Sequence, residues 1–173
     1  MPVTINGSGS ITGLTQGGID GTKVLTSAAQ PAGAILQVKQ AESSTQITQS
    51  SSADFDIVTV SLTPTAVGNK IFIFGTVMGI QNGSGNQNTR FQCKVIRDST
   101  ALTISDANHW LQGSTQVLRH GGFSINYIDT APSTNATTYK LVGYWSDTGS
   151  SQCFVNKDNN SGHTTITVME VKA

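Results

Sequence analysis

Short runs of β-branched and aromatic residues, each ended by a turn, limit what this chain can fold into more than any other feature. Thr63–Pro64 and Gly68–Asn69 close one such run, and residues 82–86 close the next. Gly, Pro and Asn favour turns for identifiable conformational reasons. No segment shows the apolar period of an amphipathic helix. The sequence therefore predicts an all-β sandwich or barrel of about 8–10 short strands.

The expected strands cover residues 35–40, 55–62, 70–80, 90–97, 100–104, 122–129, 138–145, 152–155 and 164–171, with a polar loop at 42–53. Side chains alternate between the two faces of a strand. Ile71 and Ile73 therefore share one face, and Phe72 and Phe74 share the other. A sandwich in water needs only one apolar face per sheet. With no helix to cover a second apolar face, the pattern predicts self-association.

The strand at 138–145 has the same two-sided character. Tyr139, Leu141 and Trp145 share one of its faces, while Val142 and Tyr144 share the other. The side chains expected to form the contact between copies are Phe72, Phe74, Val142 and Tyr144.

Charge is scarce, and uncharged polar residues replace it. Ten basic and ten acidic side chains give a net charge of zero, and only 12% of the residues are charged. Thr, Ser, Asn and Gln together exceed a third of the 173 residues. A neutral chain without a run of Lys or Arg has no electrostatic footprint for nucleic acid. No apolar run approaches the ~18 residues that span a bilayer, and residues 1–7 lack the features of a secretory signal.

Residues 1–34 differ from the rest of the chain and are expected to form an extended arm before a head domain at 35–173. Apolar residues are sparse there and are separated by Gly, Ser and Thr. Such a segment cannot bury enough surface to offset the entropy lost on ordering. Isolated apolar side chains suit small pockets on other chains, so the arm is expected to anchor the protein. The anchoring side chains would be Ile5, Ile11, Leu14, Ile19 and Leu25.

The two cysteines, Cys93 and Cys153, lie in apolar runs expected to be strands. They are interpreted as buried free thiols, with a bridge between neighbouring strands as the alternative. Neither has a second Cys or His at metal-ligand spacing.

Searches for catalytic, cofactor-binding and metal-binding motifs predict none. His109, His120 and His163 occur in polar stretches without a nucleophile motif. Asp54 and Asp56 share one strand face and are interpreted as solubilising residues, and residues 158–162 fail the spacing of a calcium loop. Trp110, in a polar loop-like context, is the candidate for contact with a receptor such as a surface glycan.

Several segments resemble a family of tailed-bacteriophage fibre and virion structural proteins. They are residues 62–73, 95–100, 127–139 and the terminal strand 164–171, and residues 3–14 also resemble attachment segments of such proteins. The resemblance spans most of residues 35–173. It implies a trimeric jelly-roll head, similar to tumour-necrosis-factor-like and complement-type heads, with no catalytic residues.

The function that follows is a virion structural protein, a short homotrimeric tail fibre assembled in the bacterial cytoplasm. Its arm would dock on other virion proteins and its head would face the host. The alternative is a capsid decoration or cement protein that braces the phage head. A depolymerase would need clustered carboxylates, which the 10 scattered acidic residues do not suggest.

Overall fold

The computed structural model describes residues 30–82, 89–111, 121–146, 152–157 and 163–173, and these ranges contain strands and no helix. The strands are β1 (Ile35–Ser43), β2 (Ile47–Gln49), β3 (Asp54–Leu62), β4 (Lys70–Asn82), β5 (Thr89–Arg97), β6 (Thr100–Leu111), β7 (Gly121–Thr130), β8 (Thr137–Ser146), β9 (Cys153–Val155) and β10 (Thr164–Val171). The predicted all-β class is confirmed.

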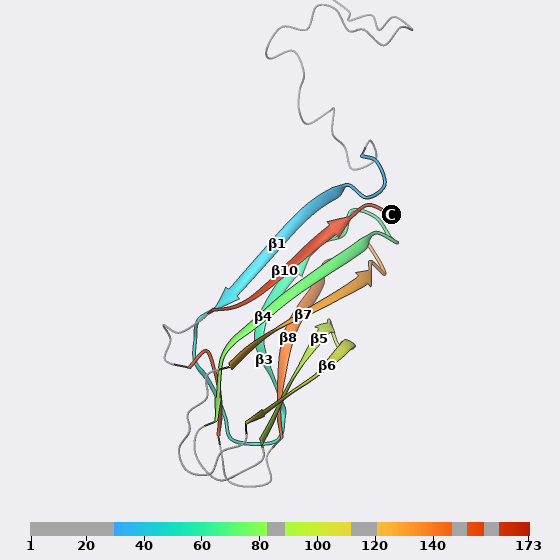
Figure 1. Cartoon of the computed structure of the whole chain (residues 1–173). Helices are drawn as coiled ribbons and strands as arrows, with labels where there is room; N and C mark the ends of the chain where they lie inside the picture. Colours follow the sequence, from blue (N-terminus) through green and yellow to red (C-terminus); the bar gives the residue numbers. More distant parts are fainter. Residues whose placement is uncertain (1–29, 83–88, 112–120, 147–151, 158–162) are drawn as a thin grey trace, which may run out of the picture.

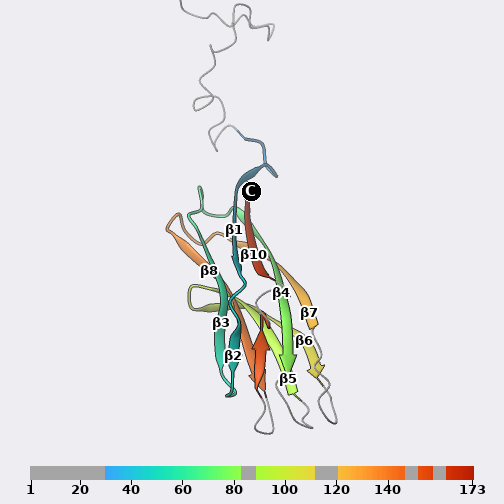
Figure 2. The same cartoon turned by 90° about the vertical axis from the view of Figure 1, so that its left-hand side faces the viewer.

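Two antiparallel sheets lie face to face in a jelly-roll sandwich (Figures 1 and 2). The first sheet has the order β1-β10-β4-β7. The short strand β9 pairs with the last two residues of β4, and β2 pairs with β9. The second sheet has the order β3-β8-β5-β6. Neighbouring strands are often distant in the sequence, as the Greek-key connections of a jelly roll require.

The core between the sheets takes one side of each alternating strand. Ile71 and Ile73 of β4 have no exposed surface, and neither do Leu141 and Trp145 of β8. Both alternation patterns predicted from the sequence are therefore confirmed. A Cβ added at Gly143 would lie 2.6 Å from the Phe55 ring, so the absent side chain lets this ring pack against the backbone of β8.

Two segments expected to be loops contain strand. In the stretch 42–53, β1 continues to Ser43 beside β10, and β2 pairs with β9. The strand that begins at Thr100 runs on to Leu111, where His109 pairs with Phe91 and Trp110 with Arg90. His109 and Trp110 therefore lie in a strand and not in a loop. Polar strands with little apolar alternation are not detected from periodicity, because backbone pairing with a neighbouring strand defines them.

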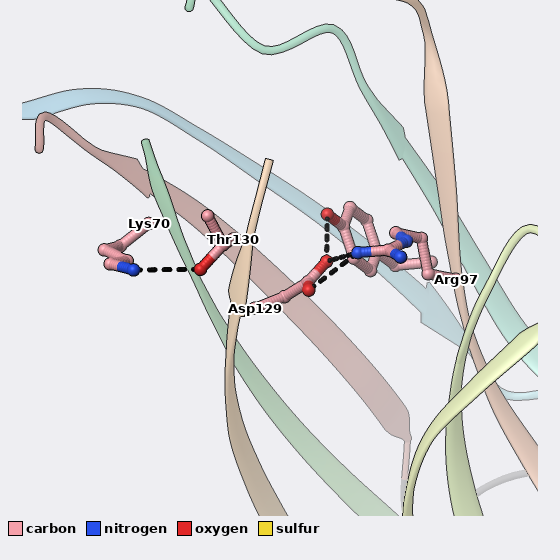
Figure 3. A network of polar contacts seen from close by, with 5 residues as sticks. Lys70, Arg97, Asp129 and Thr130 are labelled. Carbon is pink, nitrogen blue, oxygen red and sulfur yellow. Dashed lines mark hydrogen bonds and ion pairs between the residues drawn. The ribbon is translucent and has the colours of Figure 1, made fainter. Parts of the chain in front are cut away.

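An ion pair joins the two sheets at the end where β4 begins (Figure 3). The Arg97 guanidinium of β5 donates to both carboxylate oxygens of Asp129 on β7, at 2.7 and 2.8 Å. The Tyr139 hydroxyl of β8 donates to the same carboxylate at 3.0 Å. Burial raises the pKa of Tyr139, so its hydroxyl stays protonated and remains a donor. Asp129 is only 7% exposed, and the three side chains satisfy each other inside the sandwich.

Cys93 of β5 and Cys153 of β9 are free and fully buried, as the sequence predicts. Burial disfavours the charged thiolate. It raises the pKa of Cys93 to about 12 and raises that of Cys153 as well.

Neither cysteine is expected to react with iodoacetamide in the folded protein near pH 8, because both the thiolate and access to it are lacking. After denaturation without reductant, mass spectrometry is expected to show two alkylated thiols. A mass corresponding to an intact bridge between Cys93 and Cys153 would contradict this expectation.

Candidate assembly face

The outer face of the first sheet carries a continuous row of apolar side chains across four strands. The strand registers place Val38 of β1 opposite Met169 of β10, Met169 opposite Phe72 of β4, and Phe72 opposite Ile128 of β7. Residues directly opposite each other on antiparallel strands share a face and lie within contact range. The row therefore crosses the whole width of the sheet.

Further apolar residues extend this row along the strands. Ile35 and Val171 lie opposite each other on one side of it, and Phe74 lies on the other side. The rings of Phe72 and Phe74 stack with centroids 6.5 Å apart and planes inclined by 16°. We call the set the apolar face, and it comprises Ile35, Val38, Phe72, Phe74, Ile128, Met169 and Val171.

Solvent reaches much of the apolar face in the single chain. The exposed fractions are 59% for Ile35, 50% for Val38, 43% for Phe74 and 54% for Ile128. Polar residues bound the face toward β9: Gln40, Thr167 and Asn126 lie in the row of Phe74. Lys70 bounds its other end, where its ammonium group donates to the Thr130 hydroxyl at 2.9 Å. Contiguous exposed apolar surface with a polar rim is typical of an interaction site.

The outer face of the second sheet has a different character. Lys94 pairs with Asp54 at 2.7 Å and Lys140 pairs with Asp56 at 2.6 Å. The Lys94 ammonium also lies 5.3 Å from the centre of the Tyr144 ring. Val142 is only 2% exposed although it points away from the core. The lysine stems cover apolar surface on this face, and their paired charged ends keep it in contact with water.

The four predicted contact residues therefore do not form one surface. Phe72 and Phe74 belong to the apolar face, while Val142 and Tyr144 lie on the opposite side of the sandwich among the ion pairs. The predicted anchoring residues of the arm lie outside the described residues. Trp110 lies on β6, and the structure does not describe its side chain.

The predicted contact residues omit five members of the apolar face, namely Ile35, Val38, Ile128, Met169 and Val171. Ile128 and Met169 alternate with inward-facing neighbours, so the signal was present in both strands. Ile35 and Val38 are three residues apart and reach the same face because of an irregularity in the pairing of β1 with β10 between Ile35 and Gln37. A bulge shifts the alternation by one residue, and a simple period-two pattern does not anticipate it.

A buried carboxylate lies inward of this surface, near the end of β10. Glu170 has no exposed surface. In the contacts observed, its carboxylate accepts hydrogen bonds from neutral donors. Gln37 donates to one oxygen at 2.6 Å. The backbone and hydroxyl of Thr65 and the amide of Asn69 donate to the other at 2.8, 2.9 and 2.7 Å. We call Gln37, Thr65, Asn69 and Glu170 the carboxylate cluster.

The carboxylate cluster is expected to make the head less stable in acid. Burial alone would raise the pKa of Glu170, but the hydrogen bonds from Asn69, Gln37 and Thr65 together lower it below the ordinary value of 4.5. A folded-state pKa below the unfolded one adds stability that is complete above the unfolded value and lost as the pH falls through the folded value. Urea unfolding between pH 6 and 3 is therefore expected to show a loss of stability below about pH 4.5 that Glu170→Gln reduces. An identical pH profile for both proteins would contradict this.

Metal and membrane signatures are not found in the part of the chain that the structure describes. No group of three His, Cys, Asp or Glu side chains is placed to hold a metal ion there. His163 lies 3.8 Å from Glu42 and is exposed, so this contact is weak. No helix long and apolar enough to cross a membrane occurs among these residues.

The fold and this surface define a jelly-roll protein with one apolar outer face. No protein-family model and no curated protein matches the chain. Among solved structures, a chain from the structure of the infectious bursal disease virus Gx strain is similar. The alignment covers 79% of this chain and 37% of the viral chain, at 14% identity and a TM-score of 0.45. The structure of the Gt strain aligns with 82% of this chain and 39% of that chain, at 12% identity and a TM-score of 0.44.

The crystal structure of the infectious bursal disease virus VP2 subviral particle is also similar, with 79% and 37% coverage, 13% identity and a TM-score of 0.41. The chain thus spans less than two-fifths of the length of these proteins. Likeness at this level carries no inference about function, which must rest on the residues of the chain itself.

Proposed function

We propose that this chain is a virion structural protein of a tailed bacteriophage, a short homotrimeric fibre. In this proposal the arm, residues 1–34, attaches the protein to other virion proteins, and the head is exposed for host adsorption. The observation that carries the proposal is the apolar face. A surface of this kind needs cover, and the chain has no helix within the described residues to supply it.

A second copy of the chain is the most economical cover for the apolar face. The members of the apolar face are uncharged, and Lys70 and Glu42 flank it at its two ends. Fully burying one Val, Ile, Met or Phe side chain contributes roughly 1.5–3 kcal/mol. Several such side chains on each copy are enough to offset the cost of association.

Symmetry allows only one of the two outer faces to lie at the axis of a closed trimer. The two faces lie on opposite sides of the sandwich. Joining opposite sides head to tail produces an open stack, whereas a closed ring needs contact surfaces inclined toward a common axis. A trimer with Phe72 and Phe74 near its axis leaves Val142 and Tyr144 on the outside.

Sedimentation and labelled particles together test the proposed function. Sedimentation equilibrium at micromolar concentration is expected to give a mass of three 18.1-kDa chains. A stable monomer would contradict the proposal. Deleting residues 2–30 is expected to leave a folded trimeric head that no longer joins particles, because the arm supplies the attachment. Normal incorporation of the truncated head would show that the arm is not the anchor, and labelling of the capsid instead of the tail would favour a decoration protein.

A further inference from the structure

The base of the arm is held by the last residues of the chain. Pro31 to Ala34 form a turn in which the Ala34 amide donates to the Pro31 carbonyl at 3.1 Å. Gly33 has a φ of +83°, the value that a type II turn requires at its third position. The Gly33 amide donates to the Lys172 carbonyl, and the Lys172 amide donates to the Ala34 carbonyl, both at 2.9 Å.

Side chains strengthen this connection. The Lys172 ammonium donates to the Gln30 carbonyl, which lies before the turn. The pairing of β1 with β10 ends at Ile35 and Val171, so these contacts extend it past the strands. We call residues 30–34 together with Lys172 and Ala173 the arm joint. It lies at the end of the sandwich where β1 begins and where the chain ends (Figure 1).

The carboxylate cluster connects the arm joint to the rest of the head. Asn69 donates to Glu170 and accepts from the Ala173 amide at 3.2 Å, so it links the buried carboxylate to the C-terminus. Gln37 of β1 donates to Glu170 and also to the Thr63 carbonyl at 2.7 Å. One fully buried carboxylate thus holds together β1, β10, the segment between β3 and β4, and the C-terminus.

From this arrangement we propose that the arm joint is an orienting device, which holds Gln30, the first described residue after the arm, at a fixed position beside the end of β10. The inference rests on the proposed function in that the arm is taken as the anchor. A fixed starting point for the arm reduces the conformational entropy lost when the arm docks, and in a trimer it places three such starting points at the same end of the head.

Two variants weaken the arm joint, one through its turn and one through its link to the carboxylate cluster. Gly33→Val places a β-branched residue at positive φ, which such residues strongly disfavour. A Cβ at this position would contact nothing within 4 Å, so the head itself is undisturbed. Asn69→Ala removes the link between Glu170 and the Ala173 amide. Val60→Ala, a buried substitution on β3, serves as a control for general destabilisation.

Amide hydrogen exchange on the full-length protein tests the orienting device. The reporters are the amides of Gly33, Ala34 and Lys172, and the references are strand amides of Ile73 and Leu141. In Gly33→Val, exchange is expected to rise by about tenfold or more at the reporters and by less than about twofold at the references. Asn69→Ala also removes a donor to the buried Glu170 carboxylate, so its references are expected to rise too, and its reporters are the diagnostic amides. Val60→Ala lowers the global stability, so it is expected to raise exchange at the references and to leave the locally opening reporters nearly unchanged.

Unchanged reporter exchange in Gly33→Val and Asn69→Ala would overturn the proposal. So would an equal increase at reporters and references in Gly33→Val, because it would show that the contacts only contribute to global stability. The measurement uses no virion, so the orienting device can fail while arm-dependent attachment stands. Loss of attachment on deleting residues 2–30 is the separate test of the proposed function.

Discussion

Replacing Arg97 by Met is expected to lower the free energy of unfolding by about 3 kcal/mol, because it leaves the Asp129 carboxylate buried without its cation. The two guanidinium hydrogen bonds at 2.7 and 2.8 Å would be lost, and Tyr139 would remain as the one donor observed here. Met fills a volume similar to that of the Arg97 stem. The loss of unfolding free energy therefore results from removal of the positive charge and not from a cavity. Urea unfolding at neutral pH measures the effect.

Two further variants make the result specific to the buried pair. Lys140→Met breaks the ion pair with Asp56 on the outer face, where the Asp56 side chain is 55% exposed, and is expected to cost less than about 1 kcal/mol. Adding Asp129→Asn to Arg97→Met removes the unpaired charge and is expected to recover part of the loss. Equal effects of Arg97→Met and Lys140→Met would contradict the inter-sheet role.

The alternation of side chains was enough to predict the inward and outward residues of the central strands. Ile71 and Phe72 were assigned to opposite faces from their positions alone, and the structure places them so. The central strands are predictable because one of their faces is buried almost completely. The prediction missed β2 entirely and residues 105–111 of β6, because the polar residues there leave no apolar period.

The composition of the apolar face required the strand registers, which a single sequence does not contain. Val38 and Met169 lie opposite each other through the pairing of the first and last strands. Glu170 illustrates a different limit. Its place in β10, two residues after Val168, indicates an inward side chain, but a carboxylate is rarely buried without partners. Gln37, Thr65 and Asn69, which make its burial tolerable, come from separate segments.

Met169→Asp is expected to convert the proposed trimer into folded monomers. Met169 lies at the centre of the apolar face, opposite both Val38 and Phe72, and its side chain points away from the core. In the assembled trimer the new carboxylate would be buried without a partner, at a cost of about 3–5 kcal/mol per chain. Since each 1.4 kcal/mol changes an equilibrium constant tenfold, the dissociation constant for a subunit rises by on the order of a hundredfold or more.

Tyr144→Asp is the matched control, because it introduces the same charge on the opposite side of the sandwich. There the carboxylate lies opposite Asp54 on β3 and near the Lys94 ammonium that pairs with Asp54, and it remains accessible to water. This variant is expected to stay trimeric in sedimentation at concentrations where Met169→Asp is monomeric, with both proteins retaining the circular dichroism of a β-sandwich. If Tyr144→Asp dissociates and Met169→Asp does not, the contact lies on the ion-paired face. In that case the exposure of Val38, Phe74 and Ile128 must have another cause than self-association.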